Sequence, residues 1–163
     1  MWNIVVITVM AALVGLYVLP SERNMNSMRE MQAREMADSM GVYRQAVVRY
    51  FTATGKLDWS ASMDELKDGH YLPEWSSVYA QGDAAPWDNY RNADGIIFIY
   101  PKVLPETNIV PDLLALAHNS VTVTVYRAAD NTLYSPGDNM PVTLDLGGKP
   151  IPDGAPVWMA ASH

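Results

Sequence analysis

The stretch WNIVVITVMAALVGLYVL, from Trp2 to Leu19, carries no charged side chain, and Pro20, Glu22 and Arg23 follow it at once. As an α-helix these 18 residues would span about 27 Å. That length is close to the hydrocarbon thickness of a bilayer, about 30 Å. The stretch therefore predicts a transmembrane anchor over residues 1–20, and the rest of the chain is interpreted outward from it.

Two other interpretations of this stretch stay open, a cleaved signal peptide and a buried helix of a soluble domain. No Lys or Arg precedes the apolar run, and no small-x-small cleavage site follows it. A retained anchor is the interpretation that these features favour. The side chains expected to face lipid are Trp2, Ile4, Val5, Ile7, Val9, Leu13, Leu16 and Leu19.

The charge of the chain is unevenly distributed. The whole chain has a net charge of −7 and no cysteine, so it has neither a disulfide nor a thiolate site. Residues 21–54 hold five Arg and four acids, whereas residues 55–163 hold six basic and fourteen acidic side chains. An acidic distal part argues against binding to nucleic acid, because phosphates require basic patches.

Residues 21–54 are predicted to form one long amphipathic helix, because apolar residues recur there at three- and four-residue steps. We expect Pro20 to kink its start and Gly55 to cap its end. The second half is richer in apolar and aromatic side chains than the first. We therefore expect the second half to pack on the distal domain and the first half to stand as a stalk.

Residues 55–163 predict one small α+β domain with mostly antiparallel strands. Ser62 and Glu65 form a capping-box pattern that begins a short helix, and Gly69 ends it. A further helix is expected within 105–117, with Pro111 in its first turn. Residues 74–94 are expected to be irregular apart from one strand. Strands are expected at 87–91, 96–100, 121–126, 132–134, 142–146 and 157–160.

The sequence offers no motif that points to catalysis, a cofactor or a metal. His70, His118 and His163 lie far apart and match no metal-binding spacing. Ser62 is explained by capping, and no G-x-S-x-G is present. The acids at 138, 145 and 153 do not follow a calcium-loop pattern. We therefore expect a protein that is not an enzyme and has no catalytic, cofactor-binding or metal-ligating residues.

Methionine is concentrated in the long helix. Methionine is flexible and polarisable, which suits adaptable helix surfaces. A core face of the domain and a packing face for another membrane-anchored helix explain the stripe equally well, so both stay open. The candidate partner interface consists of Met25, Met28, Met31, Met36 and Met40. The four distal tryptophans, Trp59, Trp75, Trp87 and Trp158, are interpreted as core residues.

The segment MDELKDGHYLP, residues 63–73, resembles a passage that follows the long helix in type IVb and thin-pilus pilins. The layout of the chain is also similar to that of type IV pilin-like proteins. It departs from them in two ways, because no Gly-Phe-type processing site precedes the apolar run and no acid lies within it. We therefore expect that the chain is not processed as a major pilin. An unprocessed pilin-like protein that opens with Met-Trp resembles the PilM family of conjugative-plasmid thin-pilus systems.

The resemblance implies a non-catalytic inner-membrane component of a type IV pilus assembly apparatus, which acts through protein contacts. It implies a single pass with the distal domain in the periplasm, although Arg23, Arg29 and Arg34 after the span oppose that orientation under the positive-inside rule. Expected partners are the membrane, pilus assembly proteins or pilins, with a homo-oligomer also open. Two alternatives remain, a minor pilin within the fibre and a tethered periplasmic binding or hydrolytic domain.

Overall fold

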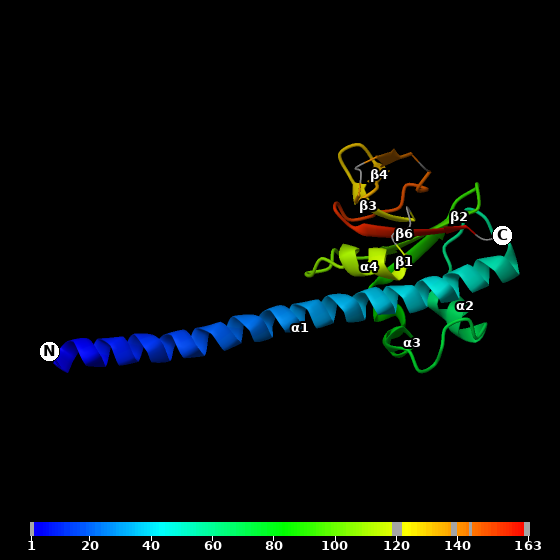
Figure 1. Cartoon of the computed structure of the whole chain (residues 1–163). Helices are drawn as coiled ribbons and strands as arrows, with labels where there is room; N and C mark the ends of the chain where they lie inside the picture. Colours follow the sequence, from blue (N-terminus) through cyan, green and yellow to red (C-terminus); the bar gives the residue numbers. More distant parts are fainter. Residues whose placement is uncertain (1, 119–121, 138–139, 144, 162–163) are drawn as a thin grey trace.

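One helix runs the length of the protein and carries a domain at its C-terminal end (Figure 1). The computed structural model describes residues 2–118, 122–137, 140–143 and 145–161, with side chains from residue 25 onward. Helix α1, Trp2–Thr54, has 53 residues and continues through Pro20, where we expected a kink. It ends at Thr54, and the next residue, Gly55, has a positive φ of 65° and donates its N–H to the Phe51 carbonyl, which confirms the predicted cap.

The side chains of the expected anchor, residues 2–19, lie outside the described part of the chain. Where side chains are described, no helix is both long and apolar enough to cross a bilayer.

The domain contains a six-stranded antiparallel sheet in the order β1-β2-β6-β3-β4-β5. The predicted α+β class is confirmed. In this sheet the last strand of the chain, β6, lies between β2 and β3. This last strand, β6, was expected at 157–160, and it joins β2 to β3, with Phe98 opposite Met159 and Val123 opposite Trp158. The strands are β1 Trp87–Arg91, β2 Ile96–Pro101, β3 Val123–Arg127, β4 Thr132–Tyr134, β5 Pro141–Val142 and β6 Pro156–Ala161.

Two strand predictions need correction. The strand expected at 142–146 is only the two-residue β5, and beyond it Leu146 packs into the core from a non-strand segment. The alternating pattern of VTLDL, residues 142–146, therefore arises from the burial of Leu146 and does not indicate a paired strand of that length. The strand expected at 121–126 is β3, which begins at Val123; residue 121 lies outside the described residues.

Short helices flank α1 and the sheet. They are α2 Met63–Asp68, α3 Ser77–Gln81, the 3₁₀ turn η1 Gly82–Ala84 and α4 Val110–Leu116. The capping box of α2 is present as predicted, with Glu65 N–H donating to Ser62 Oγ at 3.2 Å. Pro111 lies in the first turn of α4, also as predicted. Helix α3 and η1 fall in the segment that we expected to be irregular.

Both faces of β2 are buried, which explains its continuous apolar sequence. Ile97 and Ile99 pack toward α1, within a core that also contains Met40 and Val47. The alternate residues of β2 belong to a second core on the other face of the sheet, formed by Tyr90, Phe98, Tyr100, Tyr126, Leu133, Leu146, Ile151, Ala155 and Val157. One central strand therefore supports both cores.

Polar contacts set the position of α1 on the sheet. Trp87 Nε1 donates to Ser39 Oγ at 2.9 Å, and the next contact along α1 is one helical turn later, at Tyr43. Asn89 Nδ2 donates to the Tyr43 hydroxyl at 2.7 Å, and both side chains are buried. The Arg44 guanidinium lies over the Trp158 ring at 4.8 Å. These bonds at successive turns specify one register, because a shift of the helix would leave buried polar groups unpaired.

Glu65 is the centre of a network at the end of α1. Its Oε1 accepts from the Tyr50 hydroxyl at 2.6 Å and from Lys56 Nζ at 2.8 Å. Its Oε2 accepts from the Ser62 N–H at 2.9 Å. Burial alone would raise the pKa of Glu65, but the hydrogen bonds from Lys56, Tyr50, Ser62 and Trp59 outweigh it and lower the pKa to about 2. The charged carboxylate therefore stabilises the fold.

This network predicts a specific sensitivity to acid. The lowered pKa means that Glu65 contributes stability above its ordinary pKa of 4.5 and loses that contribution as the pH falls toward about 2. Glu65→Gln should lower the melting temperature at pH 7, and its difference from wild type should shrink between pH 5 and about 2. Thermal denaturation followed by circular dichroism measures this difference. Glu74→Gln, at an exposed carboxylate, is the control and should show no such pH-dependent difference. A constant difference for Glu65→Gln across that range would contradict the network.

Candidate protein-interaction surface

The structure divides the predicted methionine stripe into three parts. Met25, Met28 and Met31 are exposed, and the exposed fractions of Met28 and Met31 are 69% and 70%. Met36 is partly buried against the core, whereas Met40 has an exposed fraction of 0% inside it. The two interpretations of the stripe therefore apply to different residues. The candidate interface narrows to the three exposed methionines and the accessible part of Met36, because Met40 has no surface to offer a partner.

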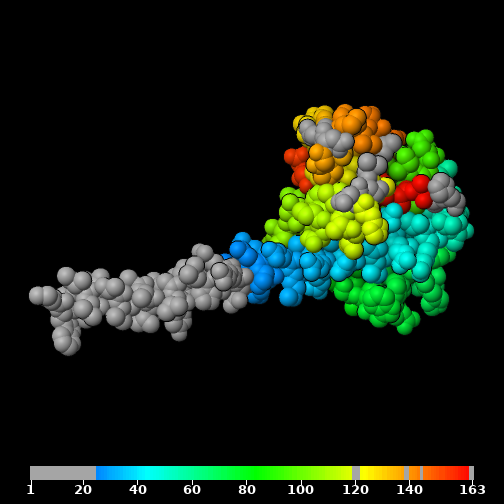
Figure 2. Space-filling model, viewed as in Figure 1, coloured from blue at the N-terminus to red at the C-terminus, as the bar shows by residue number. Residues whose placement is uncertain are grey.

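The transition from stalk to core occurs within one turn of α1. Among the side chains of α1 described from residue 25 onward, Ala33 and Ala37 are the first buried ones. Nearby, Arg34 on α1 reaches Asp112 on α4 at 3.9 Å. Figure 2 shows the segment from residue 25 emerging from beneath the domain. The expected division into a free first half and a packed second half is therefore present where side chains are described, with its boundary near residue 33.

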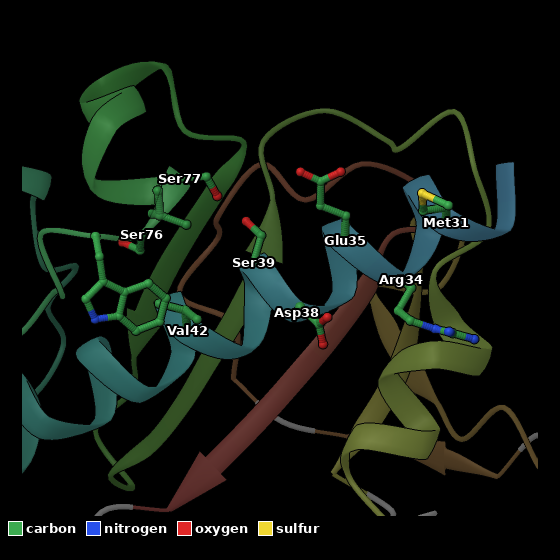
Figure 3. Close-up of a pocket in the computed structure, with 10 residues that line it drawn as sticks. Met31, Arg34, Glu35, Asp38, Ser39, Val42, Ser76 and Ser77 are labelled. Carbon is green, nitrogen blue, oxygen red and sulfur yellow. The ribbon is translucent and has the colours of Figure 1, made fainter. Parts of the chain in front are cut away.

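A groove lies where the stalk meets the domain (Figure 3). One wall is α1 and the other is the turn that leads into α3, and the cavity between them is about 430 Å³. Its floor and rim mix apolar, hydroxyl and charged side chains. The lining residues are Met31, Arg34, Glu35, Asp38, Ser39, Val42, Trp75, Ser76, Ser77 and Val78.

Trp75 projects from the domain into this groove because the turn that carries it is fixed from both sides. Ser76 Oγ donates to the Pro73 carbonyl at 2.7 Å and accepts from the Tyr79 N–H at 3.2 Å. Leu72 and Val78, which flank the turn, are buried in the core. Trp75 is 81% exposed. An exposed tryptophan on a hydrogen-bonded turn is a typical anchor for a protein partner.

The prediction that all four distal tryptophans are core residues was wrong for two of them. Trp87 and Trp158 are buried, whereas Trp59 and Trp75 are exposed. Trp59 lies outside the core because its backbone pairs with Arg91 at the edge of β1. No periodic pattern surrounds Trp75, and Ser76, which follows it, caps a five-residue helix that is too short to recognise from sequence. The absence of apolar periodicity around Trp75 is the sequence feature that could have indicated its exposure.

Acidic side chains dominate the charge of the groove. Arg34 points toward Asp112 of α4, while the Glu35 carboxylate lies on the same side of α1 as Ser39 (Figure 3). Among the described residues, Glu35 and Asp38 form no ion pair. The groove therefore combines apolar side chains with two acids that form no ion pair and with Arg34, which pairs with Asp112.

The free edges of the sheet are poor sites for adding a strand. At β1, the Arg91 N–H donates to the Trp59 carbonyl at 2.9 Å, and the Asn89 side chain pairs with both backbone groups of Ala61. At the other edge, β5 has two residues, and its Pro141 has no N–H to donate. A partner would therefore contact helices and loops more readily than strand edges.

The histidines and acids do not form a metal site in the described part of the chain. No group of three or more His, Asp and Glu side chains lies close enough there to hold an ion. His70 and His118 have positive φ values, 53° and 52°, at the ends of α2 and α4. His163 and Asp138 lie outside the described residues.

The fold and surface define a class, an α+β domain built on the C-terminal half of one long N-terminal helix with an exposed apolar surface at its base. A family model for PilM matches residues 8–159. The chain belongs to the PilM family, as its resemblance suggested. Searches of curated proteins and of solved structures found no significant match.

The different environments of the two tryptophans predict different effects of truncation. Trp75→Ala should change the free energy of unfolding by less than about 0.5 kcal/mol, because the side chain makes few contacts to lose. Trp87→Ala should lower it by about 3–5 kcal/mol, because it removes a buried ring and the bond to Ser39. Urea denaturation measures both changes. A large loss for Trp75→Ala would mean that the indole is packed and unavailable to a partner.

Proposed function

We propose that this protein is a non-catalytic, single-pass inner-membrane component of a type IV pilus assembly apparatus of the thin-pilus kind. Membership of the PilM family suggests involvement in pilus assembly, and this supports the part of the proposal that places the protein in a pilus assembly apparatus. The observation that supports this mode of action is the exposure of Met25, Met28 and Met31 at the base of the domain. A surface of this composition suits contact with pilus assembly proteins or pilins.

The membrane part of the proposal is based on the sequence of residues 2–19. An uncharged run of 18 residues is long enough to cross a bilayer, and charged residues follow it directly. The resemblance to pilin-like proteins favours a periplasmic domain, although the arginines after the span oppose it. Residues 1–20 would then anchor the chain, 21–54 would form the stalk and packing helix, and 55–163 the domain.

A charge in the centre of the proposed anchor tests membrane insertion. Leu13→Arg should shift much of the protein out of the membrane fraction, because an arginine at the centre of a spanning helix costs about 2.5–3.5 kcal/mol on insertion scales. Cell fractionation with carbonate washing measures the shift. Leu13→Ile is the control and should stay in the membrane fraction. Release of the wild-type protein by carbonate would contradict the anchor.

Charges on the exposed methionines test the proposed contact surface. Met28→Glu combined with Met31→Glu should impair pilus assembly but leave the melting temperature unchanged, because neither side chain packs in the core. Piliation counts and thermal denaturation measure the two effects. Asn26→Glu combined with Gln32→Glu adds the same charge at exposed polar positions and should assemble pili normally.

Either of two results would contradict this surface. Normal piliation by the methionine variant would show that the row is not needed for assembly. A lowered melting temperature would show that the row is packed within the protein itself.

A further inference from the structure

The exposed methionines continue into the groove as one row along α1. Met28, Met31, Glu35, Asp38 and Val42 follow one another at steps of three, four, three and four residues. This is the spacing of side chains that face a neighbouring helix. The first four are exposed and Val42 is partly exposed, so the row is accessible along its length. Its order is apolar, apolar, acidic, acidic, apolar.

Trp75 adds a second wall to this row. Trp75 lines the groove from the domain, and Val42 lines it from α1. A helix lying along the row would therefore pass between α1 and the turn before α3 at its distal end. Burial of an exposed indole in such a contact contributes a large apolar area.

The charges along the row disfavour a second copy of this chain as the occupant. In a parallel, in-register pair of α1 helices, Glu35 and Asp38 would each face their own counterparts. Like charges in these positions destabilise helix pairing. The acids have no ion-pair partner among the described residues, so they are available to a partner of opposite charge.

We propose that the row from Met28 to Val42, closed by Trp75, docks an amphipathic helix of a different protein that carries two basic side chains between apolar ones. The basic residues would lie opposite Glu35 and Asp38, and the flanking apolar residues would contact Met28, Met31 and Val42. Electrostatic complementarity of this kind selects the partner and its register. This inference rests on the proposed function, because it names the chemistry of the assembly partner.

Photo-cross-linking in pilus-producing cells tests the proposal with the full-length chain. A photoreactive amino acid replaces Trp75, and Val103, an exposed apolar position outside the groove, is the control site. We expect a product at 75 and none at 103. Sequencing of the cross-linked peptide by mass spectrometry should find a helical segment with two Lys or Arg residues three apart, flanked by apolar residues.

Charge reversal then tests the specificity of the contact. Glu35→Arg with Asp38→Arg should lower the yield at 75 by about tenfold or more, since like charges across an interface cost several kcal/mol. Glu30→Arg with Asp68→Arg makes the same change in net charge outside the row and should leave the yield unchanged. Acids placed at the two basic positions of the partner should restore cross-linking to the Arg–Arg variant.

Four results would overturn the proposal: a product with a second copy, a partner segment without the basic pair, no product above the Val103 background, or full yield in the Arg–Arg variant. Piliation of a strain lacking the protein separates this proposal from the proposed function. Normal pili in that strain together with the expected cross-link would refute only the function. Lost pili together with any of the four results would refute only the partner chemistry.

Discussion

The fold depends on the burial of one face of α1 against the inner face of the sheet. From Ala33 to Phe51 this face supplies both small and large buried side chains to the core. Small residues lead at positions 33 and 37, and Met40 and Val47 follow. Burial of each large apolar side chain contributes about 1.5–3 kcal/mol.

The continuity of α1 connects this core to the surface at its base. The stalk is the same helix as the core element, so the orientation of Met28 and Met31 relative to Trp75 is fixed by the packing of residues 33–51. The hydrogen bonds that Trp87 and Asn89 of β1 donate to Ser39 and Tyr43 set the rotation of the helix about its axis. A partner that contacts both stalk and groove would therefore meet a preorganised surface and would not have to order a flexible linker.

Local chemistry predicted much of the fold from sequence. The capping box at Ser62 and Glu65, the buried strand at 96–100 and the cap at Gly55 depend on near neighbours, and the structure contains each. The insertion of β6 between β2 and β3 depends on long-range pairing, which the pattern of residues 157–160 does not encode. The exposure of Trp75 likewise follows from how the turn before α3 is held.

Only part of the interaction surface could be predicted from the sequence, because the rest also depends on long-range packing. The periodicity grouped five methionines, but burial of Met40 depends on where the sheet begins to cover the helix. Glu35 and Asp38 belong to the same row as Met28 and Met31. A search for apolar periodicity does not find them because their side chains are charged. Family membership could be recognised from the segment 63–73 and the layout, and the family match over residues 8–159 agrees with it.

Hydrogen exchange along α1 in the full-length protein tests the central claim most directly. Amides from residue 33 to 51 should exchange only with global unfolding, because their helix face is core. Amides from residue 25 to 32 should exchange at least about tenfold faster through local opening, because no packing covers them in the absence of a partner. Equal protection from 25 to 51 would contradict the division of α1 into a core segment and a free docking segment.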